Sequence, residues 1–316
     1  MGSFLIAFLF PGQGSQAVGM GKELASLYPV ARHTFEEADE ALGMSISQLC
    51  FEGPEDQLKM TEITQPAILT MSTAVHRVLQ EKGIVPQFVA GHSLGEYSAH
   101  VAAGILSFAD AVRTVRNRGK YMQEAVPAGQ GGMAAILGME LDQLERVCAE
   151  AAQGEVVAPA NINSPEQIVI SGHQTAVERA AELAKQQGAK KTRILQVSAP
   201  FHCALMQPAQ DRLAEDLHQV QFNDPKVPVI ANIDGEPKIS GETSRQALIR
   251  QVTGAVQWTR CMQKLIALGA QRYVEVGPGK VLCGLMRQID RAQGCINVEN
   301  EASLQNVLNS LEAVSK

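Results

Sequence analysis

Ser93 lies in the segment GHSLG, residues 91–95, with a glycine two positions away on either side. The preceding QFVA is typical of a strand, and the following LGEYSAHVAA has the apolar spacing of a helix. A serine on a sharp strand-to-helix turn is the nucleophile elbow, where glycines avoid clashes and leave the hydroxyl exposed. In that geometry the backbone N–H of Leu94 points at the reacting oxygen. A tight turn with an incidental serine is the alternative for this pattern alone.

Serine is a weak nucleophile until a base takes its proton, so a histidine must lie near it in the fold. His100 stands two turns along the same helix, roughly 10 Å away, and cannot reach. His218 falls in a charged amphipathic helix, and His173 follows a strand in a different part of the chain. His202, in SAPFHC, comes just after a proline ends a strand, at the sheet edge where α/β sites form. His202 is therefore the predicted base.

The loop PGQGSQ, residues 11–16, also follows an apolar strand. It matches neither phosphate-binding pattern, because GxxxxGK[ST] is absent and GxGxxG fails at Ala17. Its small residues could still bring a second backbone N–H to an oxyanion, which is typically worth about 3 kcal/mol. Spacing alone favours a plain turn.

Arg118 is the basic residue that turns inward on a helix predicted to begin at Ser107, where Asp110 completes a capping-box pattern. At the helical period it shares a face with Met122 and small apolar residues, whereas neighbouring basic residues turn to the opposite side. A buried guanidinium needs an anion, and losing the partner of such a pair costs roughly 3 to 5 kcal/mol. That anion is an internal Asp or Glu, the commoner case, or the carboxylate of a substrate.

Four apolar runs that end in glycine or proline would position these residues: FLIAFLF, QFVAGHS, KVPVIANI and QRYVEVGPG. Helical patterns separate them, so we predict an α/β fold with a mostly parallel sheet. The middle of the chain instead reads as strand, helix, two strands, helix and strand, which is the order of a ferredoxin-like α+β unit. We therefore predict a small domain at 127–197, inserted into a large domain formed by 1–126 and 198–316.

The composition narrows the classes of partner and site. A formal net charge of −6 argues against a general nucleic-acid binder, which needs a surplus of Lys and Arg. The first apolar run is short and follows no basic residues, and no run approaches a membrane span, so we expect neither a secretory signal nor a membrane segment. Six scattered cysteines, without a CxxC pair or clustered histidines, predict no metal site and indicate reduced core residues of a cytoplasmic protein.

Seven features follow one another from about Phe10 to Leu285: FPGQGSQ, TQPA, GHSLGEYSA, Arg118, ANINSP, SAPFH and EVGPGKVL. In this order they resemble the malonyl-CoA:acyl carrier protein transacylases of fatty acid and polyketide synthesis. The resemblance implies a hydrolase-like large domain, a ferredoxin-like insert and a two-step reaction without a cofactor. A serine would take the malonyl group from malonyl-CoA, and the phosphopantetheine thiol of an acyl carrier protein would then take it from the serine.

The same resemblance implies roles for single residues. Ser93 would be the nucleophile and His202 its base, with the ring oriented by the backbone carbonyl of Gln251 rather than by an Asp. The N–H groups of Gln13 and Leu94 would hold the oxyanion.

Three further residues would recognise the acyl group. Arg118 matches the arginine that pairs bidentately with the malonyl carboxylate in this family. Phe201 looks like the malonyl-selective version, as does Leu94, since a bulky Phe201 leaves little room for a 2-methyl branch. Simple core packing of Phe201 stays open. Met122, on the same helix face as Arg118, would line the same pocket.

Three other activities compete with this interpretation. A thioesterase or lipase shares GHSLG but normally carries a late histidine, and none follows His218. A hydrolase of the same family would release free malonate. A silent docking scaffold would not need Ser93, His202 and Arg118 together. The choice between fatty acid and polyketide synthesis is open as well.

Overall fold

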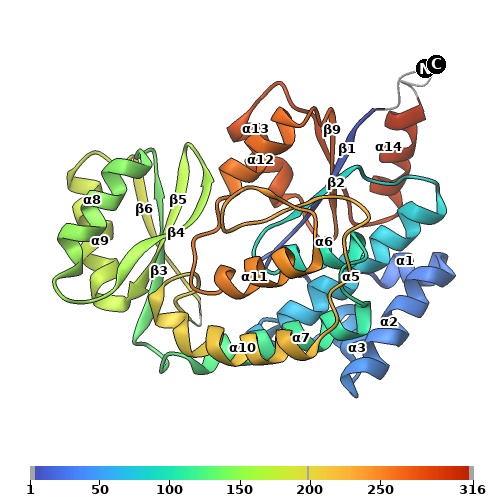
Figure 1. Ribbon diagram of the computed structural model, residues 1–316, viewed down its shortest axis with the longest axis horizontal. Coiled ribbons are helices and arrows are strands. Elements are labelled where there is room, and N and C mark those ends of the chain that lie inside the picture. The colour runs from blue at the N-terminus through green and yellow to red at the C-terminus, as the bar shows by residue number, and fades with distance from the viewer. Residues whose placement is uncertain (1–3, 198, 313–316) are drawn as a thin grey trace.

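The computed structural model describes residues 4–197 and 199–312 and contains two separate sheets (Figure 1). Ser198, the first residue of SAPFH, lies outside the described residues, as do both chain ends. Within the described part, no helix combines the length and apolar character that crossing a membrane requires.

The larger sheet has six strands in the order β10-β9-β1-β2-β7-β8, and all neighbours run parallel except β7 and β8. The strands are β1 (Ile6–Phe10), β2 (Phe88–Gly91), β7 (Val229–Ile230), β8 (Pro237–Lys238), β9 (Arg272–Val276) and β10 (Cys295–Val298). The predicted, mostly parallel α/β sheet is confirmed, with a strand at each of the four apolar runs. The apolar pattern does not predict β8, which has two residues, or β10, an edge strand in which only Val298 is buried.

Helices cover both faces of this sheet, because alternate residues of a strand point to opposite sides. Phe8 and Phe10 of β1 pack into one apolar layer, and Ala7 and Leu9 pack into the other with Trp258. The helices outside the insert are α1 (Lys22–Leu27), α2 (Pro29–Leu42), α3 (Ile46–Glu52), α4 (Glu55–Leu58), α5 (Thr61–Glu81), α6 (Gly95–Ala102), α7 (Phe108–Glu124), α10 (Gln207–Gln219), α11 (Gly241–Gln251), α12 (Trp258–Ala267), α13 (Val281–Ile289) and α14 (Glu301–Glu312), with a short 3₁₀ turn, η1 (Ala204–Met206).

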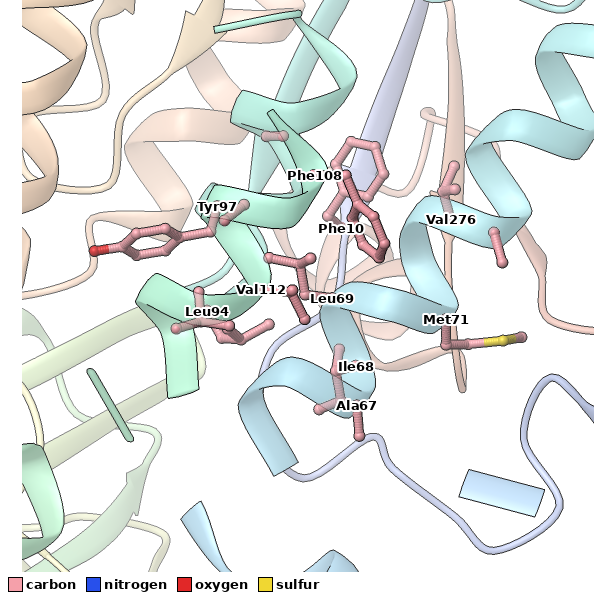
Figure 2. Packing of buried hydrophobic residues seen from close by; sticks show 14 of the residues in the cluster. Phe10, Ala67, Ile68, Leu69, Met71, Leu94, Tyr97, Phe108, Val112 and Val276 are labelled. Carbon is pink, nitrogen blue, oxygen red and sulfur yellow. The ribbon is translucent and has the colours of Figure 1, made fainter. Parts of the chain in front are cut away.

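The first of these layers fixes the helices that carry the candidate site. Figure 2 shows Phe10 of β1, Leu69 of α5 and Val112 of α7 meeting in one cluster, with Leu94 and Tyr97 of the elbow and α6 beside them. Fully burying a side chain of this size is worth about 1.5 to 3 kcal/mol. The helices α5, α6 and α7 are therefore held in place by the same core.

The second sheet is antiparallel and has the order β4-β5-β3-β6. Its elements are β3 (Gly131–Leu137), α8 (Leu141–Ala152), β4 (Val157–Ser164), β5 (Gln167–His173), α9 (Gln174–Gln186) and β6 (Lys191–Leu195). The two helices pack on one face with an apolar core of their own (Figure 1). The ferredoxin-like order of elements is thus confirmed, and all six fall within 127–197. The division into two domains at those bounds stays a prediction.

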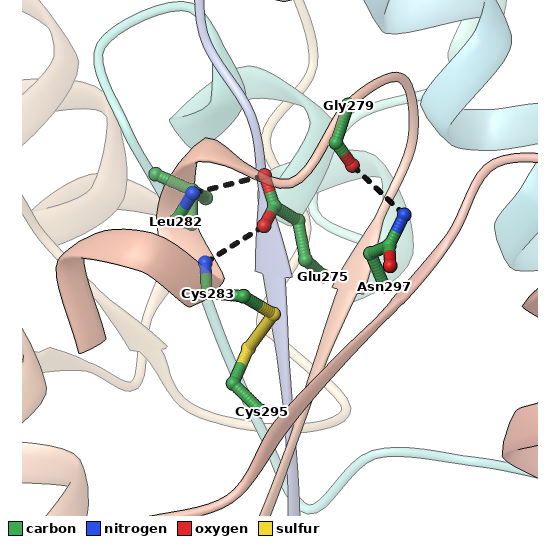
Figure 3. The surroundings of a disulfide bond; sticks show 6 residues. All are labelled: Glu275, Gly279, Leu282, Cys283, Cys295 and Asn297. Carbon is green, nitrogen blue, oxygen red and sulfur yellow. Dashed lines mark hydrogen bonds between the residues drawn. A yellow bond between two sulfur atoms is a disulfide. The ribbon is translucent and has the colours of Figure 1, made fainter. Parts of the chain in front are cut away.

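The cysteines depart in part from the expectation of six reduced core residues. Cys283 and Cys295 form a disulfide with a Cα–Cα distance of 5.1 Å, while the other four are free and buried (Figure 3). The expectation was wrong for this pair because β10, which the apolar pattern does not predict, brings Cys295 alongside the start of α13. The carboxylate of Glu275 accepts the first N–H groups of that helix, from Leu282 at 3.0 Å and Cys283 at 2.8 Å.

Candidate active site

Ser93 occupies the turn between β2 and α6, as the elbow pattern predicts. Its φ of 51° lies in the left-handed region, which costs about 1 kcal/mol or more for a residue with a side chain. The flanking glycines permit close backbone contacts: a Cβ at Gly91 would lie 1.9 Å from the Gly95 oxygen, and one at Gly95 would lie 2.0 Å from the Phe10 oxygen. The backbone therefore packs too closely at Gly91 and at Gly95 for either residue to carry a side chain.

His202 reaches the serine from the loop between β6 and η1. Its Nε2 lies 2.7 Å from Ser93 Oγ, and its Nδ1 lies 2.9 Å from the backbone oxygen of Gln251. A carbonyl can only accept, so Nδ1 carries the proton and Nε2 is free to accept the serine hydroxyl. Burial, with the positive charge of Arg118 next in importance, lowers the pKa of His202 to about 3. The ring is therefore a neutral acceptor at physiological pH.

Arg118 lies on the buried face of α7, 1% exposed, and its guanidinium points at the serine. Its Nη1 donates to Gln65 Oε1 at 2.8 Å, and its Nη2 donates to Gln251 Oε1 at 3.0 Å and to Ser93 Oγ at 3.1 Å. The Tyr97 ring lies 5.5 Å from its central carbon. Within the described residues it forms no ion pair with a carboxylate. The buried cation is thus held by neutral oxygens, which leaves it able to pair with an anion that enters the site.

These side chains open into a pocket of about 570 Å³, a size typical of small-molecule sites. Seven of the eight predicted site residues line it: Gln13, Ser93, Leu94, Arg118, Met122, Phe201 and His202. The eighth, Gln251, lies behind the pocket wall, fully buried, and touches the site through its backbone oxygen and its side chain.

The two predicted oxyanion donors flank the serine. Gln13 belongs to the loop after β1, where its side chain donates to Thr61 at 3.3 Å, and Leu94 begins the turn into α6. Among the described residues, neither backbone N–H donates a hydrogen bond to another group. The geometry is compatible with the oxyanion role, which stays a prediction.

Sequence patterns did not predict a role for four residues close to Ser93, namely Gln65, His92, Asn163 and Asn232. Gln65 holds Arg118, Asn232 accepts the Ser93 N–H at 2.7 Å, and His92 Nε2 pairs with Asn163 Oδ1 at 2.8 Å. Three of them stand in segments quoted for the resemblance, Gln65 in TQPA, His92 in GHSLGEYSA and Asn163 in ANINSP, but the patterns gave none of them a chemical role. Asn232 ends a predicted strand, and nothing in its spacing marks it.

Comparison with known proteins places this geometry in a family. A family model described as the acyl transferase domain matches residues 7–304. The malonyl CoA-acyl carrier protein transacylase of Escherichia coli K12 is 52% identical over 284 residues, which cover 90% of this chain and 92% of that protein. The crystal structure of an acyl carrier protein S-malonyltransferase from Vibrio cholerae is 49% identical with a TM-score of 0.94, covering 96% of this chain and 99% of that one. A malonyl-transacylase solved in complex with a type II PKS acyl-carrier protein is 46% identical with a TM-score of 0.95, covering 97% and 99%.

Proposed function

The chain belongs to the acyl transferase domain family, and we propose that it transfers the malonyl group of malonyl-CoA to the phosphopantetheine thiol of an acyl carrier protein. The observation that carries the proposal is the buried Arg118 guanidinium, which contacts the Ser93 hydroxyl and has only neutral acceptors in the free protein. A short acyl group attached to that oxygen and ending in a carboxylate would reach the cation.

In the first proposed step Ser93 Oγ attacks the thioester carbon of malonyl-CoA, and His202 Nε2 takes the hydroxyl proton. The N–H groups of Gln13 and Leu94 would hold the oxyanion, a contribution of about 3 kcal/mol for each donor. The carbon–sulfur bond then breaks, the proton passes from His202 to the leaving thiolate, and malonyl-serine remains. Burial keeps the His202 ring neutral in the free protein, so its Nε2 is available to accept the Ser93 hydroxyl proton.

The second step reverses the first with a different thiol. The phosphopantetheine thiol of the carrier protein gives its proton to His202 and attacks the malonyl-serine carbonyl, and the serine oxygen leaves with that proton. A complex of a related transacylase with an acyl-carrier protein supports this partner class. The side chains named here suffice for both steps, so we expect no cofactor.

Selectivity for malonyl is the finer part of the proposal. We infer that Arg118 pairs with the malonyl carboxylate through two parallel hydrogen bonds. Met122 is buried beside it and Phe201 borders the same pocket, so both would restrict branching at the central carbon of the acyl group. The relatives include a polyketide system, so the pathway served by this chain stays open between fatty acid and polyketide synthesis.

One experiment tests the proposal and separates it from hydrolysis. Brief exposure to malonyl-CoA should add one malonyl group to the protein, located at Ser93 by peptide mass spectrometry and absent from Ser93→Ala. Adding holo acyl carrier protein should then move that group to the carrier thiol. Release of free malonate at the same rate with and without the carrier would instead identify a hydrolase, and no adduct would refute the proposal.

A further inference from the structure

We propose that Glu96 is a positioning residue for the proposed acyl transfer. Its buried side chain holds Gln251 and Asn232 in place. These two residues in turn orient Ser93, His202 and Arg118. The inference rests on the proposed function, in which Ser93 and His202 perform the chemistry. Glu96 does not border the pocket and touches neither of those two side chains. It is a fully buried acid, 0% exposed, in the first turn of α6.

Two N–H donors converge on one oxygen of Glu96. Its Oε2 accepts the side-chain amide of Gln251 at 2.7 Å and the backbone N–H of Asn232 at 3.0 Å. Gln251 is the last residue of α11, and Asn232 lies two residues after β7. Glu96 therefore connects α6 to two segments that are distant in the sequence. Each hydrogen bond is worth about 0.5 to 1.5 kcal/mol to a neutral acceptor and about 1.5 to 3 kcal/mol to a charged one, so the two bonds together favour one side-chain orientation in either protonation state.

The orientation of the Gln251 amide decides what surrounds it. Its Nε2 donates to Glu96 and also to the Ser93 backbone oxygen at 3.0 Å, while its Oε1 accepts from Arg118. A flipped amide would turn an oxygen toward the Glu96 carboxylate and an N–H₂ toward the guanidinium, which are two repulsive contacts. The same residue's backbone oxygen orients His202. Glu96 therefore controls the residue that serves both the base and the cation.

Asn232 forms the second arm of the arrangement. Its Oδ1 accepts the Ser93 N–H at 2.7 Å and its Nδ2 donates to the Gly91 oxygen at 2.7 Å, so it spans the turn on both sides of the serine. The bond to Glu96 holds its backbone in register for these two contacts. Hydrogen bonds of Asn232 with the backbone of Gly91 and Ser93, together with the bond between Asn232 and Glu96, thus stabilise the left-handed conformation of Ser93.

The acceptor oxygen at the correct reach, rather than the negative charge, is what the geometry requires. Burial raises the pKa of Glu96 to about 7, although the hydrogen bonds from Asn232 and Gln251 oppose this effect. The charges of Asp234, which raises the pKa, and of Arg118, which lowers it, matter less for Glu96. The other titratable groups that interact with it, Tyr97 and Cys261, stay neutral because burial raises their pKa values as well. A protonated Glu96 keeps a carbonyl oxygen that can accept both donors, so the arrangement survives either state.

This distinction gives a paired test. Glu96→Gln keeps the length and one acceptor oxygen without the charge, whereas Glu96→Asp keeps the charge one methylene further back. Glu275 supplies the matched control, because it is also fully buried and also accepts two N–H groups, at the start of α13. The control substitutions are Glu275→Gln and Glu275→Asp.

The measurements are the rate constants for acylation of Ser93 by malonyl-CoA and by acetyl-CoA, with labelling by a fluorophosphonate probe and thermal midpoints alongside. We expect Glu96→Gln to stay within about threefold of the wild type. Glu96→Asp should lose about 10²-fold with malonyl-CoA, the scale of a misplacement near 1 Å, and its malonyl-to-acetyl ratio should fall because Arg118 loses its support. The Glu275 variants should melt earlier with an unchanged ratio.

Several results would overturn the inference. It is wrong if Glu96→Asp reacts like the wild type, if Glu96→Gln loses as much as Glu96→Asp, or if the ratio of the two acyl rates moves equally in the Glu275 variants. Failure of the proposed function looks different, because the wild type itself would then not be acylated by malonyl-CoA. In that case the fluorophosphonate labelling rates of the same variants still decide whether Glu96 positions Ser93.

Discussion

The parallel sheet and the antiparallel sheet border the same pocket but contribute chemically different side chains. The carboxyl ends of β1 and β2 and the helices after them supply Gln13, Ser93 and Arg118, whereas β3, β4 and the end of β6 supply Met133, Asn161 and other groups without charge. Parallel strands bring several loops to one edge, so polar groups from distant segments can converge there. An antiparallel sheet presents alternate side chains of continuous strands, which suits an apolar wall. The proposed nucleophile and the cation therefore come from the parallel-sheet side, the proposed base from the loop after β6, and the uncharged lining from the antiparallel sheet.

The largest test of this contrast removes the cation from the parallel-sheet side. Arg118→Ala should slow acylation by malonyl-CoA by about 10²-fold or more, because losing one partner of a desolvated charge pair costs about 2 to 5 kcal/mol. Acylation by acetyl-CoA, which has no carboxylate, should change far less. Rates with both thioesters in the same preparation provide the check, and equal losses would contradict the role of Arg118.

Acid pH should destabilise the parallel-sheet side. Burial lowers the pKa of His76 and His100 to about 4 and that of His202 to about 3, so the unfolded chain takes up these protons first, near pH 6.5. Their contribution to stability is complete above that pH and is lost as the pH falls toward 4. The raised pKa values of Glu96, about 7, and Glu275, about 6, act in the opposite direction, but the histidines outnumber them.

Between pH 6.5 and 4.5 the unfolded chain binds on the order of one proton more than the folded protein. The free energy of unfolding should therefore fall by about 1.4 kcal/mol per pH unit as the pH decreases. Urea unfolding at pH 7 and pH 5 measures it, and hydrogen exchange locates it. Greater protection of β1 and β2 at pH 5 than at pH 7 would show that the glutamates dominate.

The smallest effect on the acylation rate should come from truncating a side chain of the antiparallel sheet that lines the pocket. Met133 of β3 is buried and borders the pocket without a polar contact. Met133→Ala should lower the free energy of unfolding by about 2 to 5 kcal/mol, the usual cost of such a truncation. It should change acylation by malonyl-CoA less than tenfold at a temperature where the variant is folded. A loss as large as that of Arg118→Ala would mean that the insert takes part in the chemistry.

The sequence predicted the parts of the site that depend on local patterns. GHSLG specifies a turn through its glycines, and the helical period turns Arg118 inward, so both follow from spacing alone. His202 needed one inference about distance along a helix and about the sheet edge. The fold order of the insert could be read from alternating strand and helix patterns. The turn and the inward face of α7 are each read from one short segment, whereas the choice of His202 depended on Ser93, 109 residues away.

What the sequence could not supply depends on contacts between distant segments. Glu96 is joined to Asn232, 136 residues away, and to Gln251, 155 residues away, each by one hydrogen bond. No periodicity marks Glu96 or Asn232, and Gln251 was named only through the family resemblance. The disulfide was missed for the same reason, since it needs the position of β10 at the sheet edge. The neutral oxygens that Arg118 contacts in the described residues also could not be predicted, because they come from segments far apart in the chain.

Among the described residues, Ser93, His202 and Gln153 are the three non-glycine residues with positive φ. Two of the three are thus the proposed nucleophile and base, so the protein keeps its least comfortable backbone where its chemistry is done. Glycine at either position would remove about 1 kcal/mol of backbone strain, offset in part by the larger conformational entropy that glycine loses on folding. A related chain that does not use these two side chains can therefore carry glycine there without this backbone strain. Glycine at either position in a related sequence would indicate that this relative has lost the acyl-transfer chemistry.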